Sequence, residues 1–327
     1  MLDVFFYEAF EEEEQALERH LLPGMKAGFT WKTIQEAGNH TPPASIISIR
    51  TQSVLPILWA KTISGLLSRS TGYDHILVYL HKCQQKLPCG YLPSYCSRAV
   101  AEQTMLLWMA LLRKLPKQIH QLKNFNRDGL TGQECQNKVL LIVGVGSIGY
   151  EVIQIGKGLG MNVLGVDIVE KYPDVSYTSI DKGLSQADII VCAMNLTADN
   201  VNYFNYQLLM RGKPGLVFIN IARGELSPTV DLLRLLDENF LGGVGLDVYD
   251  EEKKLAIMLR NEDITDKETL VTLELAKRDN VILTPHNAFN TQEAVERKSV
   301  DSIKQIANFL EYGKFLWPVT QELACVK

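Results

Sequence analysis

A glycine-rich turn in the middle of the chain constrains the fold more than any other feature. Residues 139–167, VLLIVGVGSIGYEVIQIGKGLGMNVLGVD, place Gly144-x-Gly146-x-x-Gly149 directly after an apolar run and at the head of a helical pattern. In that context the first glycine allows a tight turn, the second lets a phosphate approach the backbone, and the third lets helix and strand pack closely. The segment predicts a β-α-β unit in which the helix N-terminus, with Ser147 and Ile148, receives a pyrophosphate.

Apolar runs alternate with helical patterns along the rest of the chain. After residue 100 the runs are KVLLIVGV, MNVLGVD, ADIIVCAM, GLVFINIA, GGVGLDVY and NVILTPH, as expected for a parallel sheet covered on both faces. Before residue 100, strands are expected at 2–9, 44–49 and 62–70, with a helix over EEEEQALERHL. The fold class is therefore α/β, with two doubly wound parallel sheets.

Two helical patterns indicate how the domains are organised. One long apolar-periodic helix is expected over residues 99–122, and it marks a domain boundary near residue 100. The last pattern, EAVERKSVDSIKQIANFLEYG, is one amphipathic helix without a strand of its own. We expect it to pack back on the first domain.

Composition excludes several classes of protein. The 327 residues carry a formal net charge of -5 with dispersed basic residues, which argues against nucleic-acid binding. The first residues are acidic, and no apolar run is long enough to span a bilayer, so we expect neither export nor membrane insertion. The six cysteines form no CxxC pair, which favours reduced thiols in a cytoplasm and no metal site. The run from Glu11 to Glu14 is interpreted as a solvated helix face.

An acidic residue follows the glycine motif at the expected distance. Asp167 ends the next apolar run, roughly 20 residues on, where a carboxylate can accept hydrogen bonds from a ribose diol. A 2'-phosphate would be repelled there, and the following IVEK contains no arginine, so NAD is favoured over NADP. The alternative is a glycine turn with a surface aspartate.

Three groups with complementary chemistry stand at later strand ends. A 2-oxo acid needs a cation for its carboxylate and an acid to protonate its oxygen as hydride arrives, and Arg223 and His286 fit these roles. Glu252 fits the third role, because a carboxylate on the imidazole favours its charged form. Taken singly, Arg223 could cap a helix, and Glu252 lies in an acidic loop with Asp250 and Glu251.

At this point the chain resembles the D-isomer-specific 2-hydroxyacid dehydrogenases, and within them it is most similar to the NAD-dependent D-lactate dehydrogenases. The stretches that carry the resemblance are SRSTGYDHI (68–76), YCSRAVAEQT (95–104), VGVGSIG (143–149), INIARGEL (219–226), GLDVYDEE (245–252) and ILTPHNAFNT (282–291). The resemblance implies that Arg223, Glu252 and His286 are catalytic. It further implies amide groups of Thr71 and Gly72 on the substrate carboxylate, pocket walls from Tyr95 and Phe289, and cofactor contacts from Ala222 and Asp247.

The resemblance also implies a topology and an assembly. A substrate-binding domain of residues 1–98 plus 292–327 receives a Rossmann-type NAD-binding domain, 99–291, as an insertion, and the protein is a homodimer through the cofactor domain. This chain departs from the family in places. Ala193 and Asn195 replace a usual histidine and proline near the nicotinamide, which can alter cofactor affinity. Gln103 and Asn290 replace a common histidine and tyrosine, which leaves the substrate identity open.

Three functions therefore remain in competition. The first is NADH-dependent reduction of a small 2-oxo acid to the D-2-hydroxy acid. The second is a non-catalytic, NAD-sensing protein similar to the corepressors that share this fold. The third is a dehydrogenase for a dicarboxylic or phosphorylated hydroxy acid. For the third, Arg50 in SIRTQS is the candidate contact to a second anionic group, and the alternative is a solvated Arg50.

Overall fold

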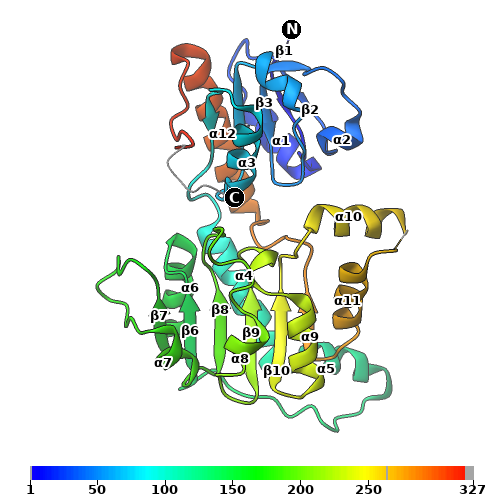
Figure 1. The fold of residues 1–327 in the computed structure, drawn as a ribbon, viewed down its shortest axis with the longest axis vertical. Coiled ribbons are helices and arrows are strands. Elements are labelled where there is room, and N and C mark those ends of the chain that lie inside the picture. The colour runs from blue at the N-terminus through cyan, green and yellow to red at the C-terminus, as the bar shows by residue number, and fades with distance from the viewer. Residues whose placement is uncertain (1, 263, 321–327) are drawn as a thin grey trace. The chain divides into compact units, whose positions relative to one another are not determined.

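The computed structural model describes residues 2–262 and 264–320 of the chain. It divides into two compact units, one formed by residues 1–96 with 290–327 and the other by 97–289. The first unit therefore contains both ends of the colour scale in Figure 1.

The first unit is built on a five-stranded parallel sheet with the strand order β2-β1-β3-β4-β5. Its strands are β1 (Leu2–Phe6), β2 (Ala27–Phe29), β3 (Ala44–Ile49), β4 (Gly65–Ser68) and β5 (Cys89–Gly90). Its helices are α1 (Glu11–His20), α2 (Ile34–Ala37), η1 (Ile57–Lys61), α3 (Asp74–Cys83) and α12 (Gln292–Tyr312). Alternating strand residues face two separate apolar clusters. One lies under α1 and α12, and the other lies under α3 and η1.

The second unit has a six-stranded parallel sheet with the order β11-β10-β9-β8-β6-β7. Its strands are β6 (Val139–Val143), β7 (Asn162–Val166), β8 (Ile189–Cys192), β9 (Leu216–Asn220), β10 (Leu241–Leu246) and β11 (Val281–Leu283). Its helices are α4 (Ser97–Leu112), α5 (Leu115–Gln121), η2 (Leu122–Asn124), α6 (Ser147–Gly158), α7 (Ile180–Leu184), α8 (Tyr206–Leu209), η3 (Gly224–Leu226), α9 (Thr229–Asp237), α10 (Glu252–Asn261) and α11 (Lys267–Ala276).

Helices cover both faces of this second sheet (Figure 1). Helices α4 and α6 pack together on one face, while α7, α8, α9 and α11 contribute to the large apolar cluster on the other. The chain passes from β6 to β7 on one side and returns to β8 on the other, so the strand order reverses between β6 and β8. Ligands of open parallel sheets bind at the carboxyl ends of the strands at such a reversal.

The single helix expected over residues 99–122 is wrong in one respect. Helix α4 ends at Leu112, and Lys114 adopts a left-handed conformation with a φ of 53° before α5 begins. Pro116 lies in the first turn of α5, where a missing amide hydrogen costs nothing, whereas inside one continuous helix it would break the ladder. Two strands are also shorter than expected, because β1 ends at Phe6 and β4 spans only Gly65–Ser68.

The interpretation of Glu11 to Glu14 as a solvated face is wrong at Glu13. The Glu13 carboxylate is fully buried and lies 2.8 Å from Arg69 Nε and 2.9 Å from Lys298 Nζ, and both of these cations are also fully buried. Arg69 donates further to Ser48 Oγ at 3.0 Å and to the Tyr7 carbonyl at 2.6 Å. Helix α12 brings Lys298 against α1, so this charge cluster joins the two helices to the sheet.

Candidate active site

The glycine turn lies between β6 and α6, at the point where the strand order reverses. Gly144 has a φ of +96°, and a Cβ there would lie 2.5 Å from the Met194 amide nitrogen. A Cβ at Gly149 would lie 2.0 Å from the Gly144 carbonyl oxygen. Both positions therefore require glycine, the first for its backbone conformation and close approach and the second for close packing.

Gly146 has a different environment from the other two glycines. A Cβ there would meet nothing within 4 Å, so the missing side chain leaves open space beside the N-terminus of α6. Ser147 and Ile148 are the first residues of that helix, whose opening amide groups have no partner within the helix. The turn thus provides the open backbone and the positive helix end that a pyrophosphate requires.

Asp167 follows β7 and contacts the glycine turn. Its Oδ2 accepts a hydrogen bond from the Val145 amide at 2.6 Å, and its Oδ1 accepts one from the Val169 amide at 3.0 Å. A carboxylate has about four acceptor positions, so two amide donors leave capacity for hydroxyl groups. The acid is therefore fixed against the glycine turn where a ribose diol would be recognised.

Three loops follow β9, β10 and β11, which are neighbouring strands, so their ends meet at one edge of the sheet. Arg223 is in the first loop, which Asn220 holds through hydrogen bonds from Nδ2 to the Arg223 carbonyl and to Ser227 Oγ, both at 2.8 Å. The Asn220 Oδ1 accepts from the Ala222 amide at 3.0 Å. A Cβ at Gly224 would lie 1.8 Å from the Tyr249 carbonyl carbon, so this loop packs directly on the next one.

His286 and Glu252 are in direct contact. Both carboxylate oxygens of Glu252 lie within hydrogen-bonding distance of His286 Nδ1, at 2.7 and 2.8 Å. The two side chains are 23% and 19% exposed, so the pair is shielded but still reachable by a small molecule. His286 has a φ of 51°, a conformation that a non-glycine residue adopts rarely and that often marks a functional site.

Asp247 lies beneath the loop that carries His286. Its Oδ1 accepts from Thr284 Oγ1 at 2.5 Å and from the Asn287 amide at 2.9 Å, and its Oδ2 accepts from the Ala288 amide at 2.9 Å. Burial raises the pKa of Asp247 above its ordinary value, although these hydrogen bonds and the nearby imidazole lower it. The carboxylate therefore fixes the Thr284 side chain before His286 and the backbone after it.

The predicted substrate-binding residues lie on the first unit, except for Phe289. Thr71 and Gly72 follow β4, and in the part of the chain that the structure describes neither amide donates to a protein acceptor. Tyr95 is buried, which raises its pKa well above the ordinary value, and its carbonyl accepts from Arg297 Nε at 2.8 Å. Phe289, also buried, is the last residue of the second unit.

Arg50 is held rather than freely solvated. The Glu8 carboxylate accepts from the amide groups of Arg50, Gln52 and Ser53 at 2.9 to 3.1 Å, which fixes the loop after β3. The Arg50 guanidinium lies 4.7 Å from the centre of the Phe10 ring, within the range of a cation-π contact. Glu8 adopts a φ of 56° to make this arrangement.

Several supporting residues were not predicted from the sequence. Asn220, Gly224 and Glu8 touch no expected ligand, yet they fix the loops of Arg223 and Arg50. Of these residues, Gly224 could have been found from the sequence, because a glycine beside a charged residue can indicate a close backbone approach. Within the described residues there is no group of three or more side chains that could hold a metal ion. No helix among them is long and apolar enough to span a membrane.

Known proteins with a similar sequence cover most of the chain. Residues 105–288 match the family model of the D-isomer specific 2-hydroxyacid dehydrogenase, NAD binding domain. The chain is 30% identical over 316 residues to a D-lactate dehydrogenase of Streptococcus agalactiae, covering 94% of each chain. It is 33% identical over 253 residues to an aromatic 2-oxoacid reductase of Clostridium sporogenes, covering 76% of each.

Solved structures give the same result. The crystal structure of a D-lactate dehydrogenase from Aquifex aeolicus, complexed with NAD and lactic acid, superposes with a TM-score of 0.82 at 27% identity, covering 96% of this chain and 99% of that one. A D-2-hydroxyisocaproate dehydrogenase superposes with a TM-score of 0.84 at 24% identity, covering 98% and 100%, which shows a shared fold.

Proposed function

We propose that this chain, which belongs to the D-isomer specific 2-hydroxyacid dehydrogenase family, uses Arg223, Glu252 and His286 for the NAD-dependent reduction of a 2-oxo acid to the D-2-hydroxy acid. The observation that carries the assignment of residues is the contact of His286 Nδ1 with both Glu252 oxygens at the edge of the sheet that also carries Arg223.

The proposed chemistry divides the work among these side chains. Bound NADH supplies the hydride that reduces the carbonyl carbon. Arg223 holds the substrate carboxylate with its guanidinium fork and polarises the carbonyl. The Glu252 carboxylate accepts a hydrogen bond from His286 Nδ1, which keeps the imidazole charged and oriented, so Nε2 can donate a proton to the carbonyl oxygen. In the reverse direction Nε2 takes this proton back.

The other predicted residues have positions that suit binding. We assign the cofactor phosphates to Gly144, Gly146 and Gly149 with the opening amides of α6, and the ribose to Asp167. Open space at Gly146 and the fixed carboxylate of Asp167 support this assignment. Asp247 and Ala222 complete the cofactor site.

On the first unit we assign the substrate carboxylate to the amides of Thr71 and Gly72. We also assign Tyr95 of the first unit and, separately, Phe289 of the second unit to substrate binding. The two amides have no protein acceptor among the residues that the structure describes, which supports their role as donors to a ligand.

Replacement of His286 by alanine tests the acid/base assignment. We expect NADH binding, measured by fluorescence titration, to stay near wild type while turnover falls about 10²- to 10⁴-fold. His81→Ala, which changes an exposed histidine on α3, is the matched control and should retain full activity. Normal turnover in His286→Ala would overturn the assignment.

Two classes of substrate fit the proposed site, and they differ in the number of anionic groups. We favour a small monocarboxylic 2-oxo acid, as for the D-lactate dehydrogenases that the chain resembles. The fixed position of Arg50 over Phe10 supports a second candidate, a substrate with another anionic group. Rates of NADH oxidation with pyruvate, 2-oxoisocaproate, phenylpyruvate, oxaloacetate and 2-oxoglutarate distinguish the two.

We also propose a cytoplasmic homodimer that associates through the second unit. Apolar side chains that are 41% to 72% exposed follow one another along α4, α5 and the turn after them, and burial in a dimer would remove them from water. These are Leu106, Leu115, Ile119, Leu122 and Phe125. We expect the wild type to sediment with the mass of a dimer, and Ile119→Lys and Phe125→Lys to sediment with the mass of a monomer. A monomeric wild type would refute the proposed dimer.

A further inference from the structure

Helix α10, which presents Glu252 to His286, has few local features that stabilise it. Its N-cap residue, Glu251, adopts a left-handed conformation with a φ of 48° and makes no side-chain cap. Of the described residues of α10, Leu255 alone is buried. A short helix with so little buried surface depends on tertiary contacts for its position. The position of the Glu252 carboxylate therefore depends on what fixes the first turn of α10.

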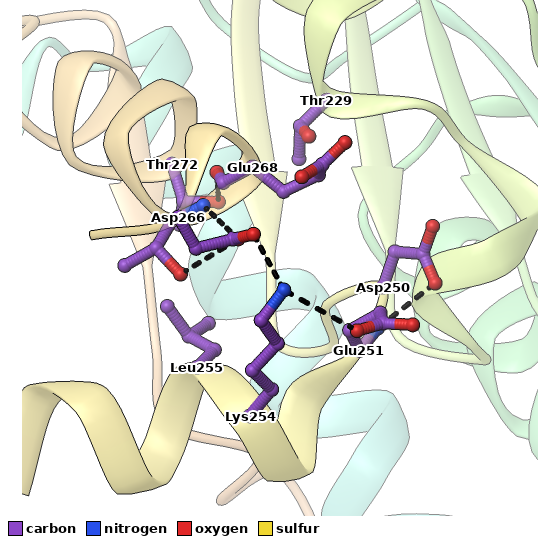
Figure 2. Close-up of a pocket in the computed structure, with 9 residues that line it drawn as sticks. Thr229, Asp250, Glu251, Lys254, Leu255, Asp266, Glu268 and Thr272 are labelled. Carbon is purple, nitrogen blue, oxygen red and sulfur yellow. Dashed lines mark hydrogen bonds and ion pairs between the residues drawn. The ribbon is translucent and has the colours of Figure 1, made fainter. Parts of the chain in front are cut away.

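Two contacts hold this turn, because Leu255 is buried in the large apolar cluster and Lys254 makes an ion pair. Figure 2 shows its ammonium between Asp266 and Glu251, 2.5 Å from Asp266 Oδ1 and 3.8 Å from Glu251 Oε2. Lys254 is two residues after Glu252, within the same helical turn. The ion pair therefore fixes the end of α10 that carries the partner of His286.

Asp266 is a rigid anchor for this contact. It is the N-cap of α11, and its Oδ2 accepts from the Thr269 amide at 3.1 Å. The buried Thr269 also lies 3.5 Å from Met258 Sδ on α10, through its Oγ1. Helix α11 packs on α9 and contributes Leu275 to the large apolar cluster. The ion pair of Lys254 therefore fixes α10 to a helix that is itself packed in the core.

The pocket in Figure 2 is a small gap where these helices pack together, and it is too small to be a binding site. Its volume is about 10 Å³, which is space for about one water molecule. Several acidic side chains surround it, but Lys254 and the amide donors of α11 already bind Asp266. Packing is therefore the role that the geometry supports.

We propose that Lys254 and Asp266 form a clamp that positions the Glu252 carboxylate against His286 and so tunes the acid/base step. Neither residue touches the reacting atoms, so both are positioning residues. This inference rests on the proposed function, because it requires Glu252 to support the charged imidazole.

Two substitutions on opposite sides of the clamp test it. In both Lys254→Met and Asp266→Asn, the first turn of α10 loosens and the imidazole holds its proton less well. We expect the upper pH limit of 2-oxo acid reduction to move to lower pH in both. We expect kcat above that limit to fall about twofold to fivefold, with KM for the 2-oxo acid nearly unchanged. Asparagine is itself a good N-cap, so Asp266→Asn preserves the start of α11.

The direction of the two shifts separates positioning from simple electrostatics. If the charges acted on the imidazole through space, loss of an anion at Asp266 and loss of a cation at Lys254 would move the pH limit in opposite directions. Asp247 also lies near His286 and Tyr249 lies near Glu252, and neither of them is altered. Opposite shifts, or no shift in either variant, would overturn the clamp.

Combination with Glu252→Gln completes the test. A residue that acts through Glu252 should add no further loss when Glu252→Gln is already present, whereas independent effects would multiply. Lys277→Met, which removes an exposed ion pair with Glu274 on α11, is the matched control and should leave the pH profile unchanged. Hydrogen exchange of residues 252–261 should rise in both clamp variants and not in this control.

The outcome for Glu252→Gln alone separates the two proposals. A normal pH profile in this variant would refute its role in catalysis and the clamp with it. A lowered limit in Glu252→Gln, with normal profiles in Lys254→Met and Asp266→Asn, would refute the clamp alone.

Discussion

Removal of the Glu13 carboxylate should destabilise the first unit more than its position in a run of four glutamates suggests. Glu13, Arg69 and Lys298 are all fully buried, and the carboxylate lies within 2.9 Å of both cations. Glu13→Gln keeps the size of the side chain but leaves the buried Arg69, and Lys298 wherever it is protonated, without this anion. Breaking a buried charge pair in this way costs about 3 to 5 kcal/mol of unfolding free energy.

The loss should depend on pH because Lys298 can release its proton. Burial lowers the pKa of Lys298 from 10.5 to about 7, although Glu13 raises it. Without Glu13 the folded-state pKa of Lys298 falls further. Above pH 7 the lysine is neutral in both folded proteins and adds nothing to the difference between them. Below pH 7 the wild type binds this proton while the variant does not, which adds about 1.4 kcal/mol per pH unit to the loss.

The stabilisation from the Glu13 carboxylate is itself lost only at low pH. Burial raises its pKa, but the ammonium of Lys298 and the guanidinium of Arg69 lower it, and the result is about 2 against an ordinary 4.5. A lowered carboxylate pKa stabilises the fold fully above the ordinary value, and this stabilisation is lost as pH falls toward the folded value. Between about pH 6 and pH 8 the carboxylate contribution is therefore constant.

Urea unfolding of wild type, Glu13→Gln and the control Glu12→Gln at about pH 6 and about pH 8 provides the measurement. Because the two units can unfold separately, hydrogen exchange of the β1 and β3 amides should locate the loss. Glu12 is exposed, so its variant should change little. In Glu13→Gln with Lys298→Met, the pH-dependent part should disappear. A loss in Glu13→Gln equal to that in Glu12→Gln at both pH values would refute the reasoning.

The remaining predictions concern ligand recognition. Arg223→Lys should lower kcat/KM by about 10- to 150-fold, because a point charge cannot reproduce the fork on a carboxylate, and unchanged kinetics would place Arg223 outside the site. Asp167→Ala should narrow the preference for NADH over NADPH, while equal use of both by the wild type would show that this acid does not select the cofactor. Arg50→Ala should lower the ratio of kcat/KM for oxaloacetate to that for pyruvate if Arg50 binds a second anionic group, and an unchanged ratio would exclude that role.

The sequence alone determined the features that depend on neighbours along the chain. The spacing of Gly144, Gly146 and Gly149 after an apolar run predicted the turn between β6 and α6, because these glycine requirements arise within one β-α unit. The apolar runs predicted the parallel strands, and they also predicted that Arg223 and His286 follow strands, whereas Glu252 is the first residue of α10. The side-chain period of strands and helices is a property of the backbone, so it can be read without knowing the partners.

Only the tertiary structure decided which polar residues are buried and which loops are fixed. Four consecutive glutamates look alike in sequence, and Glu13 differs from its neighbours because α12 brings Lys298 to it and the residue after β4 is Arg69. Likewise Glu8 binds the amides that follow β3, and Asp266 binds Lys254 across a helix boundary. Such contacts join residues distant in sequence, and their energies depend on the shared burial of both partners, a quantity that exists only once the helices have packed.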